Sequence, residues 1–148
     1  MSQSLARNTI HLVFSTKNRE PTIAPGLDAK LFAYLAGTLN ELQCPALSVG
    51  GVADHVHIMF VLSRTISLSG TVEEIKKSSS KWMKKNGVPR FYWQSGYGAF
   101  SVSASSEKDV SAYIANQAER HRKLSFQDEL REFLKKHRVE WDERYVWD

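Results

Sequence analysis

The sequence has little cysteine and no long hydrophobic run. Its 148 residues include one cysteine, Cys44. An internal disulfide and a CxxC metal site are therefore excluded, and the fold must be held by burial in a reducing compartment, which favours the cytoplasm. No stretch of roughly 18 apolar residues occurs, and the first residues lack the apolar core of a signal peptide. Neither secretion nor membrane spanning is expected.

Charge of one sign does not dominate the chain either. Lys and Arg total 20 and Asp and Glu total 16, so the net charge is +4. This balance excludes a disordered acidic tail and is compatible with an anionic partner. Hydrophobic residues make up 42% of the chain, and a chain of this length usually builds one core. We expect a single domain over residues 1–148, without internal repeats or low-complexity linkers.

Hydrophobic periodicity predicts the order of the elements. Alternation of apolar and polar residues is typical of strands, and recurrence at helical spacing is typical of amphipathic helices. The expected strands are 9–15, 46–52, 55–62, 91–94 and 99–104, and the expected helices are 27–42, 68–86, 107 to about 123, and 126–136. The order strand, helix, hairpin, helix, strand predicts an α+β fold of the ferredoxin-like or RRM-like type. Its antiparallel sheet would carry helices on one face, followed by additional C-terminal helices.

The most informative residues are His55 and His57, at the start of the second hairpin strand. Side chains at i and i+2 project from the same face of a strand, about 6.5 Å apart along the backbone, so both rings could bind one metal ion. Val56 and the alternate residues after it must be buried on the opposite face. The histidine face is then free to host a site. Two structural strand histidines are the alternative interpretation.

A second pair, Tyr113 and Gln117, lies four residues apart on the expected third helix. This spacing places a phenol and an amide on one helix face, in the same arc as His121. A buried tyrosine beside a hydrogen-bonded glutamine is the commoner explanation of such a pair. The spacing alone therefore assigns no role to it.

Four segments taken together carry a resemblance to a known family. In chain order they are Ile10–Lys17, Asp54–His57, Trp93–Ser103 and Tyr113–Gln117. This ordered set resembles the HUH single-tyrosine transposases of small bacterial insertion sequences, the IS200-like family, and the resemblance extends over nearly the whole chain. It implies a ferredoxin-like domain that cuts and rejoins single-stranded DNA at hairpin-marked ends of a mobile element.

The resemblance also implies roles for particular residues. His55, His57 and Gln117 would hold a divalent ion, Mg²⁺ or Mn²⁺, and Tyr113 would be the nucleophile. Relatives commonly have two histidines just after the glutamine segment, whereas this chain has an arginine and His121, so no role transfers to His121. The resemblance further implies a homodimer in which the tyrosine helix of one subunit completes the histidine pair of the other.

The implied chemistry suits a tyrosine nucleophile. A phenol with a pKa near 10 is ionised to about one part in a thousand at neutral pH, so it needs a metal-polarised phosphodiester or a local base. Its attack would leave a 5′-phosphotyrosine and a free 3′-hydroxyl, and this covalent bond stores the energy for rejoining. The chain accordingly has no GxxxxGKS/T nucleotide-binding loop.

Basic residues predict the contacts with DNA. The half of the helix expected over 68–86 that faces away from the core is rich in lysine, and arginines elsewhere add to it. The predicted contacts are Lys76, Lys77, Lys81, Lys84, Lys85, Arg90 and Arg120. A solvated helix face is the alternative interpretation of such a row.

Two other functions remain open from the sequence. One is a ferredoxin-like domain that binds single-stranded nucleic acid and has lost catalysis. The other is a replication initiator or relaxase with the same two-histidine chemistry, although the chain lacks an appended helicase domain. In each case we expect a cytoplasmic protein that is associated with the nucleoid when it is bound to DNA.

Overall fold

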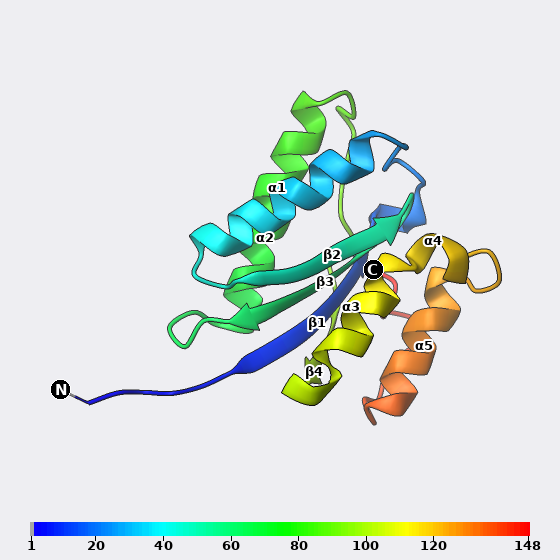
Figure 1. Cartoon of the computed structure of the whole chain (residues 1–148). Helices are drawn as coiled ribbons and strands as arrows, with labels where there is room; N and C mark the ends of the chain where they lie inside the picture. Colours follow the sequence, from blue (N-terminus) through cyan, green and yellow to red (C-terminus); the bar gives the residue numbers. More distant parts are fainter. Residues whose placement is uncertain (1) are drawn as a thin grey trace.

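A computed structural model describes residues 2–148 (Figure 1). Its four strands form one antiparallel sheet of order β2-β3-β1-β4. The strands are β1 (Asn8–Ser15), β2 (Ala46–Val52), β3 (His55–Leu62) and β4 (Gly98–Val102). The helices are α1 (Leu27–Glu41), α2 (Leu68–Lys85), α3 (Glu107–Ala115), α4 (Gln117–Arg120) and α5 (Phe126–Lys136), with short 3-10 turns η1 (Lys17–Arg19) and η2 (Ala104–Ser106). The predicted ferredoxin-like α+β fold is confirmed.

Helices cover both faces of this sheet. On β3, Val56, Ile58 and Phe60 are fully buried in the main core, which also contains residues of α1 and α2. The alternate residues, beginning with His55 and His57, face the other way, where α3, α4 and α5 form a second layer (Figure 1). The C-terminal helices cover the histidine face, which was predicted to host a site, and both histidines are inaccessible to solvent.

The second layer has a hydrophobic core of its own. Val13 of β1 and Phe100 of β4 pack there against apolar side chains of α5, among them Leu130. Trp141 and Trp147 are partly buried at the edge of the same cluster. This packing fixes the rotation of α5 over the sheet and thereby determines which of its polar residues point toward the histidines.

A glycine sets how closely α3 approaches the sheet. A Cβ atom at Gly50 would lie 2.6 Å from the carbonyl oxygen of Ile114, a separation that real Cβ atoms do not show. The bare backbone of Gly50 therefore allows α3 to pack directly on β2. Gly50 is also the register partner of His57 in the β2–β3 pair. The helix that carries Tyr113 is thus held above the histidine pair.

Residues 91–94 do not form the strand that was predicted. Trp93 makes an isolated bridge to Thr16, and the regular fourth strand spans 98–102. The rings of Phe91 and Trp93 meet edge to face, with centroids 4.7 Å apart, in the main core. Phe91 and Trp93 are core side chains two residues apart in an irregular segment. This spacing imitates the alternation of a strand.

The helix predicted from 107 to about 123 is divided into two. α3 ends at Ala115 and α4 begins at Gln117, with Asn116 between them at φ −99° and ψ 21°. Asparagine has a low helix propensity because its side chain competes for backbone hydrogen bonds. The break does not separate the predicted pair, since Gln117 is buried and Tyr113 partly buried on the sheet side.

Candidate metal and nucleophile site

A buried cluster of polar side chains lies between the sheet and the second helix layer. His55 and His57 of β3, His121 after α4 and Glu129 of α5 each offer one ligand atom, and these atoms lie within 4.8 Å of one another. Glu129 Oε1 is 2.8 Å from His57 Nε2, 3.5 Å from His55 Nε2 and 3.1 Å from His121 Nε2. The Glu129 carboxylate is therefore the centre of the cluster.

Both predicted residues of the third helix reach this cluster. Gln117 Oε1 accepts a hydrogen bond from His55 Nε2 at 3.2 Å, and Gln117 Nε2 donates to Glu129 Oε2 at 3.3 Å. The Tyr113 hydroxyl donates a hydrogen bond to the same carboxylate oxygen. The structure thus brings together Tyr113, Gln117 and the histidine pair within a single chain.

Two further side chains orient the histidine rings. Asp54 Oδ1 accepts a hydrogen bond from His55 Nδ1 at 2.7 Å, and His57 Nδ1 lies 2.8 Å from His11 Nε2. Both partners engage Nδ1, so the Nε2 atoms of His55 and His57 point into the cluster. A histidine that binds a metal usually has its second ring nitrogen held in this way. Because His11 can donate or accept, His57 Nε2 can either donate to Glu129 or bind a cation.

Burial and hydrogen bonding set the charges of the cluster. Burial lowers the pKa of His55, but the hydrogen bonds to Asp54 and Glu129 outweigh it and raise this pKa to about 9. Burial would raise the pKa of Glu129, but the surrounding histidines hold it well below its usual range. Burial lowers the pKa of His57. At neutral pH, a protonated His55 therefore lies beside an ionised Glu129 and a neutral His57.

The Tyr113 hydroxyl stays protonated in this environment. Burial and the hydrogen bond to Glu129 raise the pKa of Tyr113 above its ordinary value, and the nearby Arg120 guanidinium acts in the opposite direction. The Arg120 guanidinium carbon lies 5.0 Å from the centroid of the Tyr113 ring, and Arg120 Nη2 lies 3.2 Å from Glu132 Oε2. Arg120 is thus a predicted DNA contact that lies at the cluster itself.

The donor set fits a divalent cation. Bonds of about 2.0–2.6 Å to one ion place its ligand atoms no more than about 5 Å apart, which the cluster satisfies. Among residues 2–148, His121 Nε2 is buried without a hydrogen-bond partner, since its approach to Glu129 lacks hydrogen-bond direction. This nitrogen is available as a ligand. A bound cation would replace the proton of His55 as the positive charge that balances Glu129.

Sequence patterns did not identify Glu129, although a signal for it exists. Glu129 lies on α5 in the same stripe as Phe126, Leu130 and Phe133, which face the second core. A carboxylate in an apolar stripe must find a polar partner when the helix packs. The identity of that partner is not readable from the sequence, because His57 lies 72 residues away.

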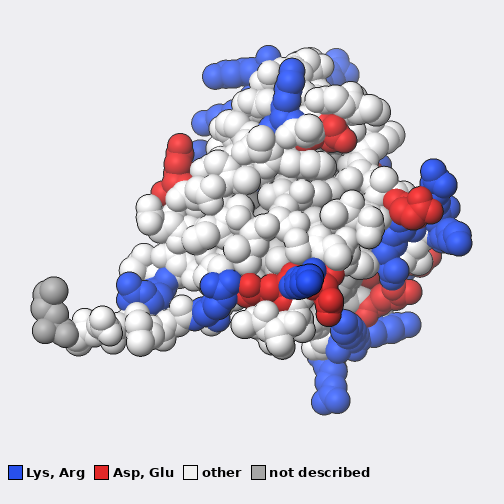
Figure 2. Space-filling model, viewed as in Figure 1, with Lys and Arg blue, Asp and Glu red and all other residues white. Residues whose placement is uncertain are grey.

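The exposed lysines predicted to bind DNA lie on the other side of the sheet. Lys77, Lys81 and Lys85 border a groove beside the stacked rings of Tyr34 and Trp82. α2 packs on the sheet face opposite to the histidines, so these lysines cannot reach a phosphate that is bound at the cluster. Figure 2 shows Lys and Arg gathered near the C-terminal end of α2 and again beside α4 and α5.

Two other predicted contacts form internal bonds. Lys76 Nζ donates to the three carbonyl oxygens of residues 94–96, at 2.9, 3.3 and 2.6 Å, and burial lowers the pKa of Lys76 to about 8. Lys84 Nζ donates to Ser80 Oγ at 3.0 Å and lies 4.3 Å from the centroid of the Tyr92 ring. Lys76 therefore holds the loop before β4, in place of offering its ammonium group to DNA. Arg90 is exposed.

Fold and cluster together define a ferredoxin-like domain with a candidate metal and nucleophile site on one sheet face. The sequence matches the family described as transposase IS200-like over residues 4–117, which is most of the chain. The chain therefore belongs to the IS200-like transposase family. No protein with a curated description shows significant similarity to it.

Two solved structures share this fold. One is a crystal structure of a candidate transposase from Deinococcus radiodurans R1, with a TM-score of 0.63 and 19% identity, covering 79% of this chain and 98% of that chain. The other is a REP-associated tyrosine transposase bound to a REP hairpin, with a TM-score of 0.60 and 16% identity, covering 82% of this chain and 74% of that chain. At these identities the likeness establishes the fold. Among the helices within residues 2–148, none is long and apolar enough to cross a membrane.

Proposed function

We propose that residues 1–148 form one HUH-type transposase domain that cleaves and rejoins single-stranded DNA through Tyr113. The observation that carries this proposal is the meeting of the Tyr113 hydroxyl with a buried histidine and carboxylate cluster, in a chain of a transposase family. His55, His57 and Gln117 would hold Mg²⁺ or Mn²⁺, and Glu129 joins them as a further ligand. Bound there, the ion supplies Lewis acidity to the scissile phosphodiester.

The chain's own groups would prepare and orient the nucleophile. The Tyr113 oxygen attacks phosphorus, a Tyr–O–P bond forms, and the bond from phosphorus to the 3′-oxygen breaks. The 3′-oxygen takes up a proton and leaves as a hydroxyl, while the DNA remains attached as a 5′-phosphotyrosine. The hydroxyl proton leaves as the new bond forms, and Glu129, which already accepts its hydrogen bond, is placed to receive it. Rejoining is the same exchange in reverse.

Two surface hollows lie beside the buried cluster. One, of about 350 Å³, is lined by Tyr113 and Arg120 among others. The other, of about 530 Å³, is lined by His121 and Arg122 among others. The two hollows flank the cluster, and the arginines in both can bind phosphates. A strand that crosses from one hollow to the other would pass its phosphate over Tyr113.

Hairpin-marked DNA is the substrate that we propose. The structural neighbour bound to a REP hairpin supports this choice, since it shares the fold. The exposed residues Lys77, Lys81, Lys85 and Arg90 lie away from the cluster, where they would bind duplex or flanking phosphates instead of the scissile one. Their contribution would be to affinity and to salt dependence, without base readout.

The direct test is a covalent-adduct assay. The purified chain is incubated with single-stranded DNA from each strand of the regions that flank its gene, in the presence of Mn²⁺ or Mg²⁺. Denaturing electrophoresis should show a protein–DNA adduct, and mass spectrometry should place the DNA on the peptide that contains Tyr113. Tyr113→Phe should abolish the adduct, because it removes the attacking oxygen.

Tyr145→Phe is the matched control, because Tyr145 is exposed and far along the chain from the cluster; this variant should form the adduct normally. An adduct that persists in Tyr113→Phe would contradict the assignment of the nucleophile. Binding of DNA without an adduct under either ion would favour the non-catalytic binding domain.

A further inference from the structure

The hollow beside Tyr113 contains more than the groups that cleave DNA. We propose that it binds one unpaired nucleobase next to the scissile phosphate and prefers a base with an exocyclic amino group. This inference rests on the proposed function, because it takes the position of the strand from Tyr113 as the nucleophile. It adds a specificity site to that function.

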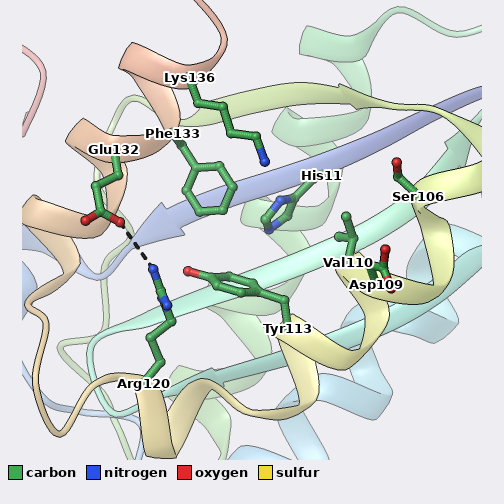
Figure 3. A pocket seen from close by; sticks show the side chains of 9 residues that line it. All are labelled: His11, Ser106, Asp109, Val110, Tyr113, Arg120, Glu132, Phe133 and Lys136. Carbon is green, nitrogen blue, oxygen red and sulfur yellow. Dashed lines mark hydrogen bonds and ion pairs between the residues drawn. The ribbon is translucent and has the colours of Figure 1, made fainter.

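Size and position fit a base. The hollow has a volume of about 350 Å³, within the range of roughly 300–1,000 Å³ that is usual for small-molecule sites. Figure 3 shows the Tyr113 ring on its wall, with its hydroxyl turned toward Arg120. A phosphate that is in contact with this hydroxyl would place its neighbouring nucleotide at the mouth of the hollow.

Aromatic side chains supply much of the wall. The ring centroids of Phe133 and Tyr113 are 5.6 Å apart, and those of Phe133 and His11 are 5.0 Å apart, both pairs meeting edge to face. Tyr113 and Phe133 are partly exposed, so ring surface is presented to the hollow. Unpaired bases stack on such rings regardless of their sequence. Apolar ring surface of this kind favours a base over a second phosphate.

The charged side chains of the hollow also favour a bound nucleobase. Lys136 and Arg120 reach in from different sides of the space (Figure 3), and these cations can hold the phosphates on either side of a bound base. Asp109 also lines the hollow, and a second phosphate there would be repelled by it. Asp109 is exposed. This carboxylate can accept a hydrogen bond from the amino group of a base, as acidic side chains do from cytosine.

Cytosine and thymine provide the test, because both are pyrimidines and cytosine alone carries an amino group. Fluorescence anisotropy measures the binding of labelled eight-nucleotide dC and dT strands to the Tyr113→Phe protein with Mn²⁺. We expect the dC strand to bind about fivefold more tightly than dT, and Asp109→Asn to abolish this preference. Glu73→Gln removes a comparable exposed carboxylate on α2, and this variant should retain the preference for dC.

A photo-cross-link locates the base independently of affinity. A dC strand that contains 5-iodocytosine should cross-link to the peptide of Phe133 or Tyr113, and Phe133→Leu should reduce the yield while thermal unfolding confirms the fold. Equal binding of dC and dT, or a preference that survives Asp109→Asn, would overturn the base site. If the base site is overturned but the unmodified protein still forms its DNA adduct, the proposed function stands without the base site. A dC preference without an adduct would support the base site and contradict cleavage.

Discussion

Glu129 is the residue that connects all parts of the candidate site. It contacts both strand histidines, the tyrosine and the glutamine, and its own side chain is inaccessible to solvent. An ionised carboxylate in that position requires a neighbouring positive charge, because burying it alone is costly. In the absence of a metal, the proton of His55 supplies that charge.

This charge balance predicts that metal binding competes with a proton. His55 has a pKa raised to about 9, so below that pH a cation must displace its proton. Affinity for Mn²⁺ should therefore rise with pH, by up to about tenfold per unit below pH 9, and level off above it. Titration calorimetry in two buffers of different ionisation enthalpy, between pH 6.5 and 8.5, measures the affinity and the released proton together.

Asp54→Asn is the informative variant for this measurement, because Asp54 helps to raise the pKa of His55. Removing its charge should lower that pKa and move the rise in affinity to lower pH. An affinity that does not change with pH would contradict the competition between the cation and the proton of His55.

At the scale of the element, α2 divides its lysines between two tasks. Lys76 is partly buried and bonded to the loop carbonyls of residues 94–96, whereas Lys77, its neighbour, is exposed. A rotation of about 100° per residue along the helix separates them. The charge of each lysine is the same in the sequence, but their surroundings differ.

The two lysines make a matched pair of substitutions. Lys76→Met should lower the free energy of unfolding by about 1–3 kcal/mol, because it removes the donor of three loop carbonyls, two of which are bonded in partly buried surroundings. Lys77→Met should change stability by less than about 0.5 kcal/mol, and it should weaken DNA binding and reduce its salt dependence. Chemical denaturation and anisotropy at several salt concentrations measure both effects. Equal stability of the two variants would contradict the role given to Lys76.

At the scale of the whole molecule, the site is assembled within one chain. Tyr113 and Gln117 contact Glu129, and Gln117 contacts His55, without any second subunit. The resemblance to transposases implies a homodimer in which the tyrosine helix of one subunit completes the histidine pair of the other. That arrangement stays a prediction. The contacts within the described chain favour a complete site in each subunit.

Complementation distinguishes the two arrangements. Tyr113→Phe and His57→Ala proteins, coexpressed so that their subunits can mix, should remain unable to form the DNA adduct if each site belongs to one chain. Light scattering establishes whether mixed dimers are present, and the unsubstituted protein is the positive control. Recovery of the adduct in a mixed dimer would show that the sites are shared between subunits.

Much of the fold could be predicted because its signals are local. Strand periodicity located β1, β2 and β3, and helical spacing located α1, α2 and α5 within a residue or two. Two predictions failed. The core side chains Phe91 and Trp93 imitate the period of a strand in an irregular segment, and the low helix propensity of Asn116 divides a helix whose apolar period continues across it.

In the candidate site, the local period of the chain already shows which residues can share a face: His55 with His57 on a strand, and Tyr113 with Gln117 on a helix. That these pairs meet, that α5 covers them and that Glu129 lies at their centre follows from the packing of the layers. The reason is physical. Side-chain direction is fixed by neighbouring backbone geometry, whereas the partner of a buried charge depends on how distant layers pack.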